Sequence, residues 1–326
     1  MNKRKFLIII SLLFLFLTTV TIATDLVIDS KTQTYSEKDG LIKFLGDVKV
    51  KYGNINVVSE KGDVSTTKDN KLDTATFYDK PYAYQIQNNK KREVKANILK
   101  LSLLNKTIRA EGDTQTIVIE GRTPIAVINA DEQEYDTKTN IMKANGVVSI
   151  KYRDMTTFSD KAIVISDKNG DVKKLDLIGH AKINQTKNHA EADHFIYTAS
   201  NEQIVAIGHT KSSTVTDNGS DFTVTSKYQQ YDKKRNVYMA TGNVEVFYED
   251  YYAKSPKMTC YPDKVTQKIN EVYMSGRSMI SQESKEVYAD KIKIIIKPKN
   301  FEAVGNVRTI IKNLSDTAKD EDGGLF

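Results

Sequence analysis

The stretch GVVSIKY, from Gly146 to Tyr152, joins a glycine to a run in which apolar and polar residues alternate. Close copies of it occur as GDVKVKY from Gly46 and as GNVEVFY from Gly242. Alternation with period two predicts a β-strand that buries one face and exposes the other to solvent. We expect the buried face of these strands, and of the similar run after Ala289, to carry ten apolar side chains: Val48, Val50, Tyr52, Val148, Ile150, Tyr152, Val244, Val246, Ile292 and Ile294.

The glycine recurs at regular intervals along the chain. From Gly112 onward, successive glycines of this kind are 34, 33, 29, 34, 34 and 29 residues apart. The interval from Gly46 to Gly112 is 66 residues, and a copy without the glycine falls between them at Asp79–Tyr84. A fixed period predicts a repeat architecture, and a glycine inside a strand usually marks a bulge or a bend. The alternative is that these glycines lie in turns. We predict strand bends at eight positions: Gly46, Gly112, Gly146, Gly179, Gly208, Gly242, Gly276 and Gly305.

A second motif, a small residue usually followed by a charged one, interleaves with the glycine motif. Its copies start at Ala130, Ser159, Ala192, Ser226 and Ala289, with further copies at Ser30, Ser59, Ala96 and Ser255. The segments between the motifs contain pairs such as Asn169-Gly170, which favour tight hairpin turns. We therefore predict that each unit forms two antiparallel strands, and about nine units fill the region from residue 24 to residue 312.

These features predict an all-β fold. If each strand bends over at its glycine, the stacked units form a long antiparallel sandwich with the apolar residues inside. A parallel β-helix is the rival architecture, because it also contains periodic glycines. It would need fewer hairpin turns than this sequence contains.

The first residues of the chain predict export. A basic run at residues 3–5 precedes an apolar run from Phe6 to Val20, and Thr21-Ile22-Ala23 offers a small-x-small cleavage site. This layout is typical of a secretory signal peptide over residues 1–23, and an uncleaved N-terminal anchor is the alternative. Cys260 is the single cysteine, so no internal disulfide forms. The 48 basic and 42 acidic side chains nearly balance, which gives no nucleic-acid signature.

The order of the motifs resembles the OstA/LptA-type repeat of periplasmic lipopolysaccharide-transport proteins. The shared pattern is a small residue with Asp or Lys, a strand, a turn, and then Ala-x-Gly-x-Val-x-Ile. The resemblance implies an elongated, folded-over antiparallel β-jellyroll, often called a β-taco, whose apolar groove shields acyl chains. The ten apolar side chains of the inward face are then the candidates that line this lipid groove. It implies lipopolysaccharide or a related glycolipid as the ligand and no cofactor. It also implies end strands that pair with inner-membrane and outer-membrane transport components, or head to tail with a second copy.

The length of the chain leaves two arrangements open. The repeats form either one extended jellyroll or two fused modules near residues 24–150 and 151–312. The final residues, 313–326, contain an acidic run, and we expect them to be disordered. Because no membrane-barrel sequence follows the repeats, the resemblance favours a bridge protein or a membrane-anchored component over a translocon.

Enzymatic function is not expected from this sequence. In an alternating strand His189 and Glu191 share a face while His194 points the other way, so no metal site is predicted. Cys260 has no partner motif and is expected to be a buried structural thiol. The alternative to a lipid groove is a cell-surface β-solenoid adhesin or scaffold. A groove needs an accessible apolar interior, whereas an adhesin needs a closed core and a functional outer face.

Overall fold

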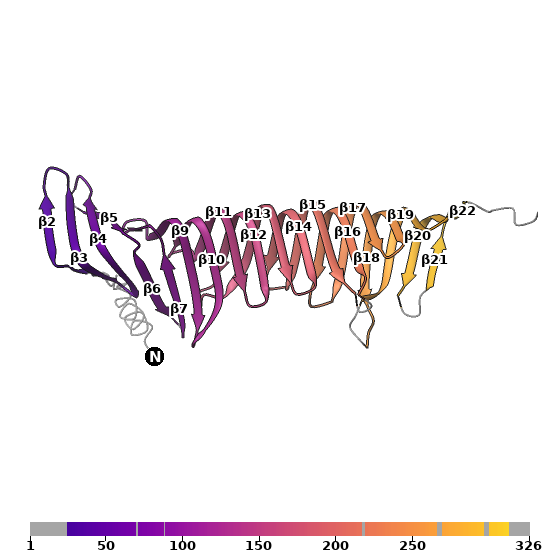
Figure 1. Ribbon diagram of the computed structural model, residues 1–326, viewed down its shortest axis with the longest axis horizontal. Coiled ribbons are helices and arrows are strands. Elements are labelled where there is room, and N and C mark those ends of the chain that lie inside the picture. Colours follow the sequence, from indigo (N-terminus) through magenta and orange to yellow (C-terminus); the bar gives the residue numbers. More distant parts are fainter. Residues whose placement is uncertain are drawn as a thin grey trace, which may run out of the picture.

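The computed structural model describes residues 25–69, 71–87, 89–216, 219–265, 269–296 and 300–312. The predicted signal peptide and acidic tail lie outside these residues. The described chain forms one antiparallel sheet of 22 strands, which confirms the all-β prediction. It runs once from one end of an elongated molecule to the other (Figure 1). Within the described ranges, no helix has the length and apolar character needed to cross a membrane.

The strands follow one another in chain order with short turns between them. They are β1 (Leu26–Asp29), β2 (Thr32–Ser36), β3 (Leu41–Tyr52), β4 (Ile55–Thr66), β5 (Leu72–Tyr78), β6 (Tyr82–Gln87), β7 (Lys90–Lys95), β8 (Ile98–Ser102), β9 (Thr107–Glu120), β10 (Thr123–Asp136), β11 (Ile141–Tyr152), β12 (Met155–Ser166), β13 (Val172–Gln185), β14 (Asn188–Thr198), β15 (Gln203–Val215), β16 (Asp221–Asp232), β17 (Val237–Tyr248), β18 (Tyr251–Pro262), β19 (Ile269–Gln282), β20 (Lys285–Ile295), β21 (Asn300–Val304) and β22 (Arg308–Ile311).

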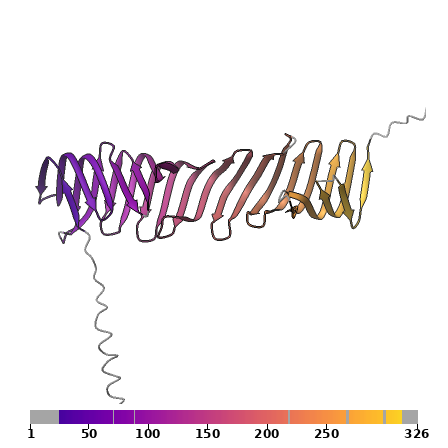
Figure 2. The ribbon, with the colours of Figure 1, turned by 90° about the horizontal axis from the view of Figure 1, so that it is seen from below.

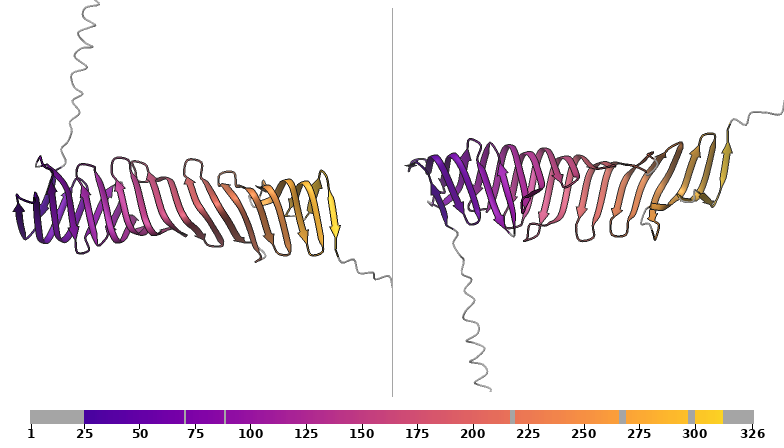
Figure 3. Two further views of the ribbon diagram at one scale, coloured as in Figure 1. Left: turned by 90° about the horizontal axis from the view of Figure 1, so that it is seen from above. Right: turned by 60° about the horizontal axis from the view of Figure 1, so that its bottom comes forward.

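The long strands are folded over once, so that each belongs to two facing layers (Figures 2 and 3). We call the two layers A and B. In the A layer, β1 pairs with residues 49–52 of β3, and in the B layer β2 pairs with residues 41–45 of the same strand. Four of the folded strands are interrupted at the fold, as β1/β2, β5/β6, β7/β8 and β21/β22. The 22 strands therefore make 18 folded strands, or nine pairs, which confirms the predicted nine two-strand units.

The fold of each strand lies at a β-bulge. Around Gly146, Asn145 pairs with Lys161 and Val148 pairs with Ser159. Two residues of β11 therefore oppose one residue of β12, which is the geometry that bends a strand and increases its twist. The backbone φ of Gly146 is +73°, a left-handed value that glycine adopts without steric cost. All eight glycines predicted to bend strands have a positive φ, and where the glycine is missing, Asp79 and Lys80 take the same conformation.

The structure explains why the two sequence motifs recur in step. Each bend glycine lies against the second residue of the small-charged motif, on the preceding folded strand. A Cβ atom at Gly146 would lie 2.1 Å from Oδ2 of Asp131. The corresponding pairs are Gly46 with Lys31, Gly112 with Asn97, Gly179 with Asp160, Gly208 with Asp193, Gly242 with Lys227, Gly276 with Pro256 and Gly305 with Asp290. These contacts form a closely packed spine along the folded side of the molecule.

The space between the two layers holds three apolar clusters. The first runs from Phe44 to Ala110, the second from Ile128 to Ala206, and the third from Val224 to Ile292. The division into two modules near residue 150 stays a prediction, and that residue lies inside the second cluster. The interior is thus apolar along the molecule, and its buried side chains form three separate clusters.

Candidate functional site

The predicted inward row lies between the two layers. Seven of its ten residues are buried: Val48, Val50, Val148, Ile150, Val244, Val246 and Ile292. Tyr52 and Ile294 pack against the first and third clusters and are half-buried. Tyr152, near the open side, is 38% exposed. The alternating neighbours, such as Lys151, face solvent. The structure distributes all of these residues except Tyr152 over the three apolar clusters, in a packed interior, and does not gather them in one open cavity.

A buried glutamine crosses the interior between the first and second clusters. Gln133 of the B layer is 4% exposed, and its amide Nε2 donates to the Thr114 hydroxyl at 2.9 Å and to the Ile128 carbonyl at 3.2 Å. The Thr116 hydroxyl donates to Oε1 of the same amide at 2.5 Å. Thr114, Thr116 and Ile128 belong to the A layer. Because these polar groups satisfy one another, they join the layers without the cost of an unpaired buried group.

A second crossing separates the second and third clusters. Gln229 is 4% exposed and donates from Nε2 to the Val224 carbonyl at 3.1 Å. Beside it, the hydroxyls of Ser212 and Tyr238 are 3.0 Å apart, and burial raises the pKa of Tyr238. Gln133 and Gln229 are 96 residues apart, as are Gly146 and Gly242. Sequence reasoning missed both crossings, and the available signal was a glutamine thirteen residues before the glycine in each copy.

The side opposite the spine is the mouth, where the turns of the two layers form two rims. The A rim carries the turns β3–β4, β6–β7 and β9–β10, and the B rim carries β2–β3, β10–β11 and β12–β13. Lys90, at the A rim, forms an ion pair with Asp171, at the B rim, with Nζ and Oδ1 2.5 Å apart. The Asp171 carboxylate raises the pKa of Lys90. Two side chains that are 81 residues apart in sequence therefore join the rims.

A second contact across the mouth lies beside the first. The Arg92 guanidinium, from β7 in the A layer, lies 4.7 Å from the ring centroid of Tyr135, from β10 in the B layer. This is the distance of a cation–π interaction. We call the pairs Lys90–Asp171 and Arg92–Tyr135 the clasp.

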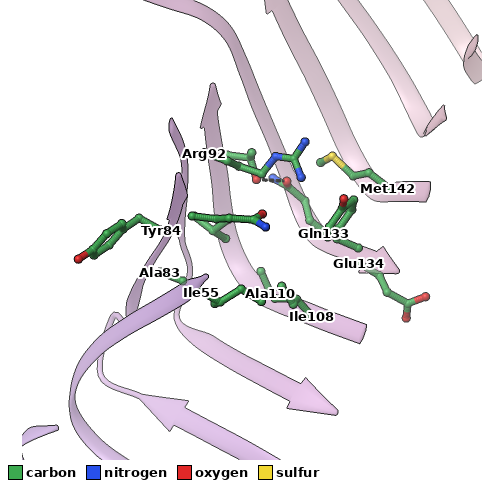
Figure 4. A pocket seen from close by; sticks show the side chains of 13 residues that line it. Ile55, Ala83, Tyr84, Arg92, Ile108, Ala110, Gln133, Glu134 and Met142 are labelled. Atoms are coloured by element: carbon green, nitrogen blue, oxygen red, sulfur yellow. Dashed lines mark hydrogen bonds between the residues drawn. The ribbon is translucent and has the colours of Figure 1, made fainter. Parts of the chain in front are cut away.

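A small open hollow, with a cavity volume of about 50 Å³, lies between the layers at the clasp (Figure 4). Arg92 and Gln133 point toward each other from opposite layers, and Met142 lies beside them. The walls are mainly apolar and come from the end of the first cluster and the start of β11: Ile55, Ala83, Val94, Ile108, Ala110 and Met142. This is the place in the described interior where an apolar wall, an open mouth and a cation come together.

Cys260 and the two histidines of the spine lie in separate environments in the described part of the chain. Cys260 is buried in the third cluster, and burial raises the pKa of its thiol to about 12. A thiol with such a pKa is a poor nucleophile at neutral pH. His180 and His209 are exposed on the spine, where each contacts one carboxylate, Asp160 and Asp193 respectively. Among the residues described, no three histidine, cysteine or acidic side chains are placed to hold a metal ion.

Comparison with known proteins gives a family. The model of a family described as LptA/(LptD N-terminal domain) LPS transport protein matches residues 27–120 and 127–222, which is more than half of the chain. The crystal structure of LptH from Pseudomonas aeruginosa, described as the LptA homologous periplasmic component of the lipopolysaccharide transport device, is similar with 13% identity and a TM-score of 0.36. That match covers 40% of this chain and 95% of LptH. No curated protein sequence matches the chain.

Proposed function

Because this chain belongs to the LptA and LptD N-terminal family of lipopolysaccharide transport proteins, we propose that it is a periplasmic bridge. In this role its interior shields the acyl chains of lipopolysaccharide on the way from the inner to the outer membrane. The observation that supports the proposal is the apolar lining, in three successive clusters, between two layers that share only one closed side. The function is transport by binding, and no chemical step is required of the protein.

The packed interior admits an acyl chain only if the layers part. The backbone hydrogen bonds run between neighbouring strands within each layer, so opening the mouth breaks none of them. Between the layers the contacts are side-chain packing, the two crossings and the clasp. An entering chain gains about 0.8 kcal/mol per buried methylene, which offsets the loss of packing between the apolar side chains. The bulges at the spine are the points where the strands flex.

Photo-crosslinking at two neighbouring positions tests the proposal in cells. A photoreactive residue at Ile150, which is buried between the layers, is expected to give a lipopolysaccharide adduct. The same residue at Lys151, which faces solvent, is expected to give none. Adducts are detected on gels with an antibody against lipopolysaccharide. If the exported, folded protein gives no adduct at either position, the closed core of a surface adhesin or scaffold becomes the better explanation.

The two ends of the sheet present strands with one neighbour each. At one end β1 and β2 pair only with β3, and at the other β21 and β22 pair only with β20, among the described strands. Unpaired backbone groups on such an edge are templates for a further strand. We propose that these edges join the chain to the neighbouring transport components or to a second copy.

The offsets of Gln33 and Thr309 from their bend glycines give the register of a head-to-tail contact. Gln33 lies thirteen residues before Gly46, as Gln133 lies before Gly146. Thr309 lies four residues after Gly305, as Thr116 lies after Gly112. In the β9–β10 pair, Thr116 is opposite Ile128. A second copy that continues this pattern places Thr309 of one copy opposite Ile28 of the next, and brings Gln33 to a third crossing.

A proline in β22 tests the edge contact. The hydrogen bond from the Lys312 amide to the Ser284 carbonyl fixes the alternation of β22, so that the Thr309 N–H points to the free edge. Thr309→Pro therefore removes an edge donor and keeps the pairing with β20. Sedimentation velocity is expected to show wild-type protein associating with increasing concentration and Thr309→Pro remaining monomeric. Thr309→Val, which keeps the N–H, is the matched control and is expected to associate. Equal association of the proline variant would exclude this edge.

A further inference from the structure

Arg92 is an inward-facing charge with an unusual environment. On β7 the neighbouring side chains Lys91 and Glu93 form an ion pair at 2.6 Å, and Val94 packs against the first apolar cluster. Strand alternation therefore places Arg92 on the face of Val94, toward the interior. Among the described residues no carboxylate forms an ion pair with its guanidinium, which rests on the Tyr135 ring. Partial burial of a cation without a counter-charge costs free energy, which an anionic ligand at this position would offset.

A second cation lies on the same face of the same strand. Lys90 precedes Arg92 by two residues, which places the two Cα atoms roughly 7 Å apart. Only 20% of the Lys90 side chain is exposed, and its partner Asp171 is 64% exposed on the opposite rim. The ion pair is therefore held from one side by a carboxylate in a solvated turn. An incoming anion replaces that carboxylate at a small cost, because Asp171 remains solvated in its exposed turn when it leaves Lys90.

The hollow supplies the apolar half of a ligand site. Its wall contains Ile55, Val94 and Met142, and Arg92 extends over it from the A layer (Figure 4). An apolar hollow under a cation fits an amphiphile with an acyl chain and an anionic head. The planar guanidinium matches a phosphate with two parallel hydrogen bonds.

We propose that Arg92 and Lys90 bind the phosphate of a phosphorylated glycolipid whose acyl chain enters between the parted layers at the hollow, with the phosphate in the place of the Asp171 carboxylate. The proposal rests on the proposed function and adds a headgroup site at one point along the mouth. Binding at this site opens the clasp, because Lys90 exchanges Asp171 for the phosphate and Arg92 leaves Tyr135. A lipid in transit would therefore pause at the boundary between the first and second clusters.

Tryptophan fluorescence on the full chain localises binding, because the sequence contains no tryptophan. Met142→Trp places a single reporter in the wall of the hollow, and Phe222→Trp places one beside the third cluster. The probes are tetradecyl phosphate and tetradecyl glucoside, each with a bromine near the end of the alkyl chain, which quenches a nearby tryptophan. Inorganic phosphate alone is the third probe.

In the Met142→Trp protein, tetradecyl phosphate is expected to quench at about tenfold lower concentration than tetradecyl glucoside, the factor expected for hydrogen bonds to a charged group. Adding Arg92→Gln is expected to abolish this preference and to leave glucoside binding unchanged. Lys91→Gln removes the same charge from the adjacent, outward position and is expected to keep the preference.

Three outcomes would overturn the proposal. The first is equal quenching by the two amphiphiles in the Arg92-containing protein, which leaves an apolar site without headgroup recognition. The second is quenching at Phe222→Trp but not at Met142→Trp, which keeps the lipid conduit and removes this site. The third is an equal response to inorganic phosphate alone, which makes it a phosphate site without lipid. Absence of quenching in both reporters counts against the proposed function itself.

Discussion

Replacement of Gly146 by alanine is expected to lower the free energy of unfolding around β11 by about 2–4 kcal/mol. At the φ of +73° an L-residue costs about 1–2 kcal/mol. The added Cβ would also lie 2.1 Å from Oδ2 and 2.9 Å from Cβ of Asp131, and shifting that side chain costs a further amount of about 1–2 kcal/mol. Native-state hydrogen exchange of β10–β12 measures the loss locally, which matters because stacked repeats open unit by unit.

Two controls separate the backbone strain from the clash. Gly121 lies in a rim turn with φ +62° and has no atom within 4 Å of a built Cβ, so Gly121→Ala is expected to cost only the backbone part. Asp131→Ala removes the clashing carboxylate, and Gly146→Ala in that background is expected to recover about half of the loss. A Gly146→Ala protein as stable as Gly121→Ala would show that the spine is loose, contrary to its close packing.

Replacement of Gln133 by alanine is expected to destabilise the boundary between the first and second clusters by about 2–4 kcal/mol. The change removes three hydrogen bonds and leaves the buried Thr116 hydroxyl without its acceptor. Each unsatisfied buried group costs about 1–3 kcal/mol, and a cavity adds to this. The layers should then part more readily at this point, seen as faster hydrogen exchange in β9 and β10.

Matched variants show whether the crossing acts through hydrogen bonds or through volume. Gln133→Met fills nearly the same space without donors, so it is expected to lose the polar part and retain the packing. Gln115, whose Nε2 donates to Asn129 at 3.0 Å outside the apolar clusters, is the control, and Gln115→Ala is expected to cost less than about 1 kcal/mol. Gln133→Met as stable as wild type would mean that the crossing fills space and does not join the layers.

The regular part of the fold was predictable from the sequence because its causes are local. Period-two alternation identifies strands such as 148–152, and the glycine spacing identifies nine folded pairs. The contact between Gly146 and Asp131 was not predicted, although both motifs were recognised, since nothing in either motif states that the two residues meet across neighbouring strands.

The polar features of the interior were not predictable in the same way. At a bulge one extra residue shifts the alternation, so the face of Gln133 depends on where the bend occurs. The pair Lys90–Asp171 depends on how strongly the sheet twists, because the two rims meet only after five further strands have been added. Such contacts follow from the whole assembly and leave no pattern at short range.

One interval of 96 residues, from Gln133 to Gln229, separates corresponding points of the two crossings. Deletion or duplication of one such interval would join a strand to the equivalent strand of another unit. The register at the bulge and the buried glutamine amide would be kept. A conduit made from separate small subunits has a length that varies with their concentration. Here the three apolar clusters are covalently linked, so the length that one chain contributes is independent of its concentration, whatever joins its ends.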